Sequence, residues 1–96
     1  MTCKLEFNID ALKEWNKIDS SVREQFKKQL ARRLEHPHIP SARLSGADMH
    51  CTYKIKLRDI GYRLIYEVND MTVTVIVLAV GKRNRSEVYD VAKSRK

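Results

Sequence analysis

The main change in the spacing of apolar residues along this chain is from a helical period to a strand period. Val22, Phe26, Leu30 and Leu34 recur every four residues, which places them on one face of a helix of about four turns. From residue 53 onward apolar and polar residues alternate, as they do in strands that bury one face. A chain with helices first and closely connected strands afterwards belongs to the α+β class, and the short connections favour an antiparallel meander.

A shorter helix is predicted before that one. Residues Cys3–Phe7 alternate weakly and indicate a short strand, and Asn8 can cap the helix that follows. Leu12, Trp15 and Ile18 fall on the side of this helix that we expect to be buried.

The second helix has a recognisable start and end. Ser21 and Glu24 have the spacing of a capping box, and Pro37 pushes the residue before it out of helical geometry. The outer face carries five cations that we expect to be solvated and available to RNA or a ribosome: Arg23, Lys27, Lys28, Arg32 and Arg33.

The second half of the chain predicts three strands and a short helix. Residues 36–50, with both prolines and Gly46, indicate a loop. Strands are expected at 53–58, 62–68 and 72–80, with a hairpin connection in which Gly61 allows a positive φ. Gly81 is expected to end the last strand, and the helix runs from Ser86 to Ala92, followed by a frayed tail. We expect residues 1–96 to form one domain.

The composition excludes several classes of protein. The net charge is +7, and residues 51–96 carry +5 of it, which points to a polyanionic partner. No apolar run approaches the roughly 18–20 residues of a membrane span, and the N-terminus does not resemble a signal peptide, so we expect a cytoplasmic protein. Cys3 and Cys51 are expected to be reduced thiols, and the three histidines do not form a metal set: His36, His38 and His50. We therefore expect no metal or cofactor.

Cationic side chains gather on one face of the predicted strands. Lys54 and Lys56 lie about 7 Å apart on the same face of their strand, because side chains alternate with period two. Other segments can reach this face and complete a cluster: Lys54, Lys56, Arg63, Arg83, Arg85 and Tyr89. Clustered like charges cost stability, so such a surface is typical of phosphate binding. Strand lysines also deter aggregation at sheet edges, and the pattern alone leaves both interpretations open.

If this face cuts RNA, its chemistry has to rest on lysine. A metal-free ribonuclease needs a base for the 2′-hydroxyl and an acid for the 5′-oxygen, usually histidine and glutamate, and the predicted face has no histidine. Neighbouring cations lower the pKa of a lysine and so favour its basic form. Arginines would stabilise the charge that develops on the phosphate, and an aromatic ring would stack on a base. Such a site aligns RNA poorly, so we expect a larger assembly to position the substrate.

Five blocks of sequence resemble a known family. They are Ala11–Trp15, Ser21–Gln25, Tyr53–Arg58, Gly61–Leu64 and Val80–Tyr89, and together they span nearly the whole chain. In this order they closely resemble the RelE toxins of the RelE/ParE superfamily. The resemblance implies the fold of small microbial ribonucleases, with two N-terminal helices packed on a roughly four-stranded, mainly antiparallel sheet and a short C-terminal helix.

The resemblance also implies an activity and roles for individual residues. RelE toxins cleave messenger RNA in the ribosomal A site by attack of the 2′-hydroxyl, leaving a 2′,3′-cyclic phosphate and a 5′-hydroxyl. By the matching motifs, Lys56 is the expected base, Lys54 and Arg63 bind the phosphate, Arg83 acts on the leaving oxygen, and Tyr89 stacks on a base. Further basic residues are expected to contact RNA or the ribosome: Arg58, Lys82, Arg85, Arg43, Lys27, Lys28 and Arg32.

The expected partners follow from the same resemblance. They are messenger RNA, the 70S ribosome and a RelB-like antitoxin that folds on binding, with operator DNA reached only through the antitoxin complex. The C-terminal helix from Ser86 is the element expected to move when the antitoxin binds. Residues 36–52 depart from the family pattern, with Ser45 at a position where a basic residue is common. Two alternatives remain open: a ParE-like gyrase inhibitor, and a module that blocks translation by binding alone.

Overall fold

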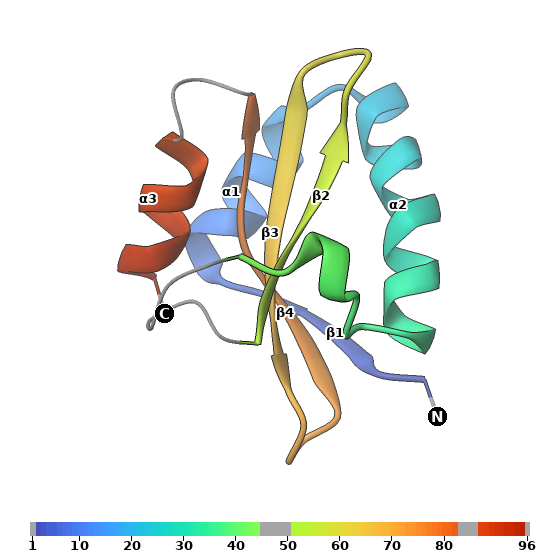
Figure 1. Ribbon diagram of the computed structural model, residues 1–96. Helices are drawn as coiled ribbons and strands as arrows, with labels where there is room; N and C mark the ends of the chain where they lie inside the picture. The colour runs from blue at the N-terminus through green and yellow to red at the C-terminus, as the bar shows by residue number, and fades with distance from the viewer. Residues whose placement is uncertain (1, 45–50, 83–86, 96) are drawn as a thin grey trace.

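The computed structural model describes residues 2–44, 51–82 and 87–95 (Figure 1). Its elements in chain order are β1 (Lys4–Phe7), α1 (Ile9–Lys17), α2 (Ser20–Glu35), a 3₁₀ turn (Pro40–Ala42), β2 (Thr52–Leu57), β3 (Tyr62–Asn69), β4 (Thr74–Lys82) and α3 (Glu87–Ser94). No helix within these ranges is long and apolar enough to cross a membrane.

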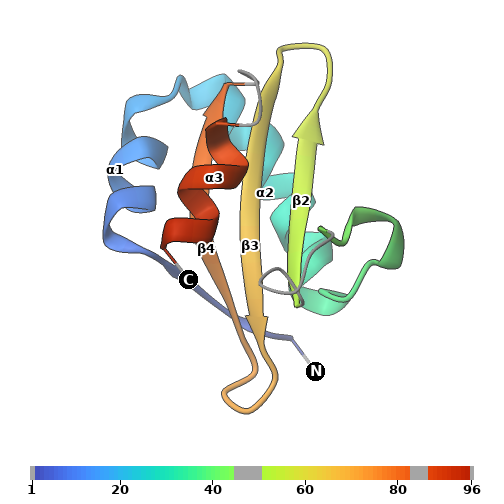
Figure 2. The ribbon, with the colours of Figure 1, turned by 60° about the vertical axis from the view of Figure 1, so that its left-hand side comes forward.

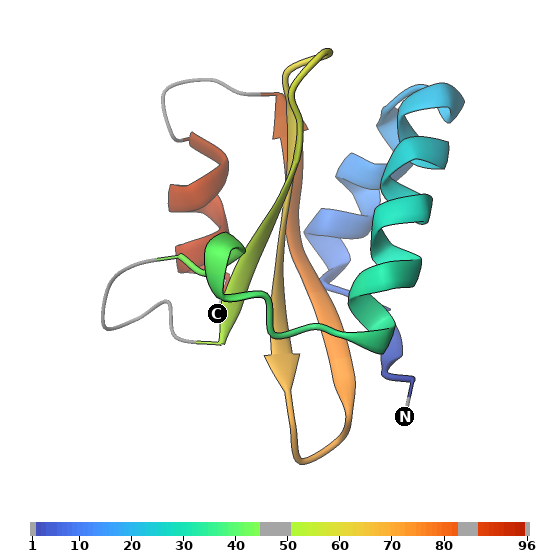
Figure 3. The same ribbon diagram turned by 45° about the vertical axis from the view of Figure 1, so that its right-hand side comes forward.

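The four strands form one mixed sheet in the order β1-β4-β3-β2. β1 runs parallel to β4, whereas β2–β3 and β3–β4 are antiparallel pairs. Helices α1 and α2 cover one face of the sheet and α3 covers the other, as the edge-on view in Figure 3 shows. This arrangement confirms the predicted α+β class and the mainly antiparallel sheet.

The sheet separates two apolar cores. The larger core lies under α1 and α2 and is built around the fully buried side chains of Phe26, Leu64 and Tyr66. The smaller core lies under α3, where Val88 and Ala92 pack on Ile65. Because successive residues of a strand point to opposite faces, Leu64 belongs to the larger core and Ile65 to the smaller one.

A β-bulge in the β3–β4 pair changes which residues of β4 face α3. Tyr66 pairs with Val77, and Ile65 pairs with Ala79, so Leu78 has no partner of its own on β3. Leu78 and Ala79 consequently both belong to the core under α3, although they are adjacent in sequence.

The N-terminal predictions are partly confirmed. The Asn8 side chain caps α1 by accepting hydrogen bonds from the backbone N–H groups of Asp10 and Ala11. Leu12, however, is 44% exposed, and Ala11 takes the buried position instead.

The capping box expected at the start of the second helix is wrong. Helix α2 begins at Ser20, so Ser21 lies inside its first turn, and the capping residue Asp19 makes no side-chain bond to the helix. Glu24 instead forms an exposed ion pair with Lys27. Val22, Phe26 and Leu30 are buried as predicted, because they face the sheet.

The end of the last strand also differs from the prediction. β4 begins at Thr74 rather than residue 72, and it continues through Gly81 to Lys82 because both residues pair with β3. Helix α3 extends to Ser94, and Arg95 is not frayed, since its guanidinium bonds to Glu14 and to the backbone of β4.

The loop after α2 is held more firmly than its composition indicates. The buried Tyr66 hydroxyl donates to the carbonyl of Pro37 at 2.7 Å. His38 bonds to the Tyr53 hydroxyl at 2.7 Å and to Asp70 at 2.8 Å. Residues 45–50, including Ser45, lie outside the described ranges.

Candidate active site on the β2–β3 hairpin

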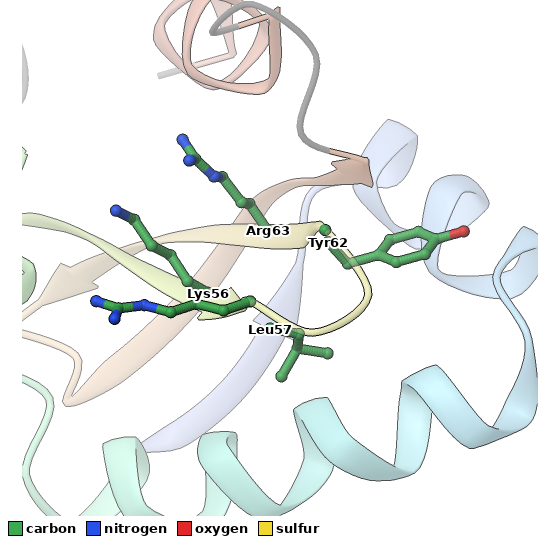
Figure 4. A pocket seen from close by; sticks show the side chains of 6 residues that line it. Lys56, Leu57, Tyr62 and Arg63 are labelled. Carbon is green, nitrogen blue, oxygen red and sulfur yellow. The ribbon is translucent and has the colours of Figure 1, made fainter.

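Two of the predicted cations lie directly opposite each other on neighbouring strands. Lys56 of β2 pairs with Arg63 of β3, and the next pair on the same face is Lys54 with Ile65. Since Ile65 belongs to the core under α3, this is the face that α3 covers in part. In Figure 4 the side chains of Lys56 and Arg63 point to the same side of the hairpin, and Leu57 points to the other.

Helix α3 brings Tyr89 onto the same face. The Arg63 guanidinium donates a hydrogen bond to the Tyr89 hydroxyl at 2.5 Å, and its central carbon lies 5.3 Å from the centre of the Tyr89 ring. Tyr89 also packs against the small core under α3. The structure therefore joins Lys54, Lys56, Arg63 and Tyr89 in one cluster, as the sequence predicted.

A pocket of about 300 Å³ opens beside this cluster at the turn of the hairpin (Figure 4). Its lining includes Lys56, Arg58 and Arg63, so three cations face one concavity. The turn is tight because Gly61 has a φ of +70°, a conformation that other residues rarely adopt. Arg58 is exposed in this turn and joins the cluster from the hairpin side.

The cationic surroundings change the basicity of Lys56. Lys54 has the largest effect in lowering the pKa of the Lys56 amine, followed by partial desolvation and the charges of Arg63 and Arg58. Each of these disfavours the protonated form, so a larger fraction of Lys56 is neutral at a given pH than for an isolated lysine. This confirms the lowered pKa that the sequence predicted for a clustered lysine.

The described histidines lie away from the cluster. His38 bonds to Tyr53, which packs in the core on the opposite face, and His36 lines a separate pocket beside α2. Glu67 shares the cluster's face but pairs with Thr52 at the far end of β2. Within the described ranges, the charges that act on Lys56 are therefore those of cations, and Tyr89 joins the cluster through Arg63.

Several predicted contact residues lie elsewhere. Lys82 ends β4 on the side opposite to Arg63, with its amine 5.9 Å from the ring centre of Tyr62. This follows from the continuation of the strand through Gly81, which places Gly81 opposite Arg63 and turns Lys82 away. Three cations belong to α2, on the other face of the sheet: Lys27, Lys28 and Arg32.

The remaining predicted contacts are only partly placed. Arg43 is exposed and forms an isolated bridge with Tyr53, beside the start of β2. Arg83 and Arg85 lie outside the described residues.

Sequence reasoning missed two arginines of α2 that bind backbone rather than solvent. Arg33 donates to the carbonyl of Lys54 at 3.3 Å and to the Tyr66 hydroxyl at 3.0 Å, so it supports β2 from behind the cluster. Arg23 donates to three carbonyls where α1 ends, including that of Ile18 at 3.0 Å. Nothing in the local pattern separates these arginines from their solvated neighbours, because their acceptors come from other segments.

The comparisons with known proteins agree with this geometry. A family model described as the ParE toxin of the type II toxin–antitoxin system parDE matches residues 5–87. The mRNA interferase toxin RelE of Escherichia coli strain K12 is 55% identical over 91 residues, which cover 95% of this chain and 94% of the relative.

Solved structures show the same fold. A mutant of the Escherichia coli toxin RelE in the free state matches with a TM-score of 0.90 and 52% identity, covering 99% of this chain and 98% of that one. A chain of the intact Escherichia coli RelBE toxin–antitoxin complex matches with a TM-score of 0.81 and 52% identity, covering 86% and 99%. By sequence and by fold, the chain belongs to the RelE toxins of the RelE/ParE superfamily.

Proposed function

We propose that this protein is the toxin of a type II toxin–antitoxin system and an endoribonuclease that cleaves messenger RNA on the ribosome. The observation that carries the proposal is the Lys56 amine, whose pKa is lowered by Lys54 and which lies opposite Arg63 on an open face of the sheet. A neutral amine surrounded by cations is suited to take a proton from a nucleophile that attacks a phosphate.

The reaction proposed is an internal transfer along the RNA backbone. Lys56 takes the proton of a 2′-hydroxyl, and the resulting oxygen attacks the adjacent phosphorus. The bond from phosphorus to the 5′-oxygen then breaks, and this oxygen receives a proton, which leaves a 2′,3′-cyclic phosphate and a 5′-hydroxyl. Lys54 and Arg63 stabilise the charge on the phosphate oxygens. We assign the stabilisation or protonation of the leaving 5′-oxygen to Arg83 and the stacking of a base to Tyr89.

The ribosome is proposed to position the substrate. Lys56 is exposed, and the described cations of the cluster are suited to phosphate contacts, which hold RNA without reading its sequence. The cations of α2, which include Lys27, Lys28 and Arg32, lie on the opposite face and remain available to ribosomal RNA. Arg58, Arg43, Lys82 and Arg85 are proposed as further RNA contacts. We place the activity in the cytoplasm, where translation takes place, and in a single domain of residues 1–96.

A RelB-like antitoxin is the proposed protein partner. The matching structures include the intact RelBE complex and a RelE mutant bound to a peptide of the antitoxin RelB. These relatives are about half identical to this chain, so an antitoxin of the same kind is expected to bind it.

The decisive experiment separates the charge of Lys56 from its basicity. Lys56→Arg keeps a cation, but a guanidinium stays protonated and cannot act as a base. We expect Lys56→Arg and Lys56→Ala both to slow cleavage of ribosome-bound message by about 10²–10⁴-fold, the usual contribution of a general base. The measurement is primer extension on stalled ribosome complexes, with Lys13→Ala on α1 as the matched control for loss of an exposed lysine.

Two results would contradict the proposal. Full activity of Lys56→Arg would show that the position supplies charge only. Arrest of translation by the wild type with intact message would make the protein a blocker rather than a nuclease. Because the matching family model describes ParE toxins, a DNA gyrase supercoiling assay belongs beside these measurements, and inhibition there would favour the gyrase alternative.

A further inference from the structure

The outer edge of β4 is only partly covered by a neighbouring strand. β1 ends at Phe7, which pairs with Val77, while β4 continues to Lys82. Two backbone groups beyond the end of β1 are bound by side chains instead. The N–H of Val80 donates to a carboxylate oxygen of Glu14 at 3.1 Å, and the carbonyl of Leu78 accepts from Arg95 at 2.9 Å.

Glu14 and Arg95 also bind each other through two hydrogen bonds. The guanidinium of Arg95 donates to the two carboxylate oxygens of Glu14 at 2.9 and 3.2 Å. Their side chains are 33% and 17% exposed, so both charges are largely removed from water. Such a pair is stable only when its polar atoms are well satisfied, and here both partners also bond to β4. We call these two residues the edge pair.

The edge pair connects the two layers of helices. Glu14 belongs to α1 and Arg95 follows α3, and these helices lie on opposite faces of the sheet (Figures 2 and 3). The pair therefore passes around the open edge of β4. The backbone N–H of Arg95 also donates to the carbonyls of Val91 and Ala92, so its side chain is fixed to the last turn of α3.

The same helix carries the aromatic residue of the candidate site. Tyr89 lies six residues before Arg95, or about 9 Å along a helix. Ala92, between them, is fully buried against the sheet. A helix held at its end and packed along one side can neither slide nor turn freely, so the direction of Tyr89 depends on where Arg95 is held.

We infer that Glu14 and Arg95 are positioning residues for the active site. Through α3, the edge pair holds Tyr89 where its hydroxyl meets the guanidinium of Arg63. The effect on catalysis rests on the proposed nuclease function, whereas the effect on the position of Tyr89 does not.

The kinetic test uses full-length protein with Arg95→Met, Glu14→Gln and Arg95→Lys, and with Lys17→Met on α1 as the matched control. Misplaced catalytic groups lower the rate of the chemical step, so kcat should fall by about tenfold or more in the first two variants. KM for the ribosome–message complex should change by less than about twofold, because the edge pair touches no substrate. Arg95→Lys keeps one ion-pair bond and should recover part of the loss.

The structural test follows Tyr89 without cleavage. Tyrosines labelled with carbon-13 only at Cζ give one resonance for each ring, and Tyr89→Phe assigns the relevant one. Arg95→Met and Glu14→Gln should shift this resonance towards its position in Arg63→Met, and Lys17→Met should leave it in place. Thermal unfolding shows that each variant is folded, and Glu14→Gln keeps an oxygen that can accept from Val80.

The outcomes separate the two proposals. An unmoved Tyr89 resonance in both folded variants overturns the edge pair as a positioning device, and so does an unchanged kcat. A rise in KM with constant kcat would make the pair a binding element instead. If the wild type does not cleave message, the proposed function fails, and the Tyr89 resonance still decides whether the edge pair positions α3.

Discussion

Lys56 combines two properties that seldom occur together, an exposed side chain and a lowered pKa. Burial is the usual cause of a neutral lysine, but here the largest cause is the charge of Lys54. A bound phosphate adds negative charge and opposes this effect, because it favours the protonated amine. A site of this kind therefore needs more cations than one phosphate neutralises, which accounts for Arg63 and Arg58 beside the same amine.

The pH dependence of cleavage should report this arrangement. In the proposed mechanism the neutral form of Lys56 is the active one, so the rate should rise with pH until the pH passes the lowered pKa, and then level off. Lys54→Met removes the main cause of the lowered pKa, so the rising limb should move to higher pH. Single-turnover cleavage measured from pH 6 to about 10 checks the shift. At a pH below the pKa, a rise of one unit in the pKa lowers the neutral fraction of the amine about tenfold.

The pH at which the cleavage rate rises, rather than the maximum rate, is the informative quantity. Loss of Lys54 also removes one of the proposed phosphate contacts, so the rate should fall at every pH. A limb that stays in place in Lys54→Met, as it should in the control Lys13→Met, would show that Lys56 is not the titrating base.

Individual site residues were predictable to different degrees. Period-two alternation assigns strand residues to faces, so the shared face of Lys54, Lys56 and Arg63 was predictable. The side occupied by Lys82 was not, since a glycine in the sequence does not reveal whether a strand ends or continues through it. The bonds made by Arg33 and Arg95 were not predictable, because their partners Lys54 and Glu14 belong to distant segments.

At the scale of elements, the two helices of the larger core begin in different ways. Asn8 accepts two backbone hydrogen bonds at the start of α1, whereas Asp19 makes no side-chain bond at the start of α2. Asp19, Ser20 and Ser21 are all residue types that cap helices, so the sequence does not determine which of them does so. The burial of Val22, Phe26 and Leu30 against the sheet determines where α2 lies, without help from a cap.

These two starts should respond differently to substitution. Asn8→Ala should lower the free energy of unfolding by about 1 kcal/mol, because it leaves two N–H groups of α1 without their acceptor. Ser21→Ala should change it by less than about 0.5 kcal/mol, since Ser21 lies within the helix. Urea denaturation of both variants makes the comparison, and a loss of equal size at Ser21 would restore the capping box.

The sequence predicts which segments are helices and which are strands, but it does not predict how the strands pair. The changes of apolar period identify the helices and strands because each period reflects one local geometry. The parallel pairing of β1 with β4 joins residues 4–7 to residues 74–77, and no local pattern reports it. The bulge at Leu78 likewise depends on how β3 and β4 meet.

At the scale of the whole molecule, Tyr66 ties three segments together on the side of the sheet away from the site. It is fully buried on β3, and its hydroxyl accepts from Arg33 of α2 and donates to Pro37 of the following loop. Burial raises the pKa of the Tyr66 hydroxyl, so the proton that it donates is retained over the working pH range.

Removal of this hydroxyl should break both hydrogen bonds. Tyr66→Phe keeps the ring but leaves the carbonyl of Pro37 and the guanidinium of Arg33 without their partner, and we expect a loss of about 1–3 kcal/mol in the free energy of unfolding. Chemical denaturation measures the loss, with Tyr62→Phe as the control. Equal stability of the two variants would show that these bonds are replaced by water at no cost.

The pairing of β1 with β4 has a consequence for folding during synthesis. A growing chain emerges from the ribosome with its N-terminal strand first. That strand cannot pair until residues 74–77 of β4 have been synthesised. The sheet cannot close, and α3 cannot bring Tyr89 to Arg63, until nearly the whole chain has been synthesised. The candidate site is thus completed only near the end of synthesis.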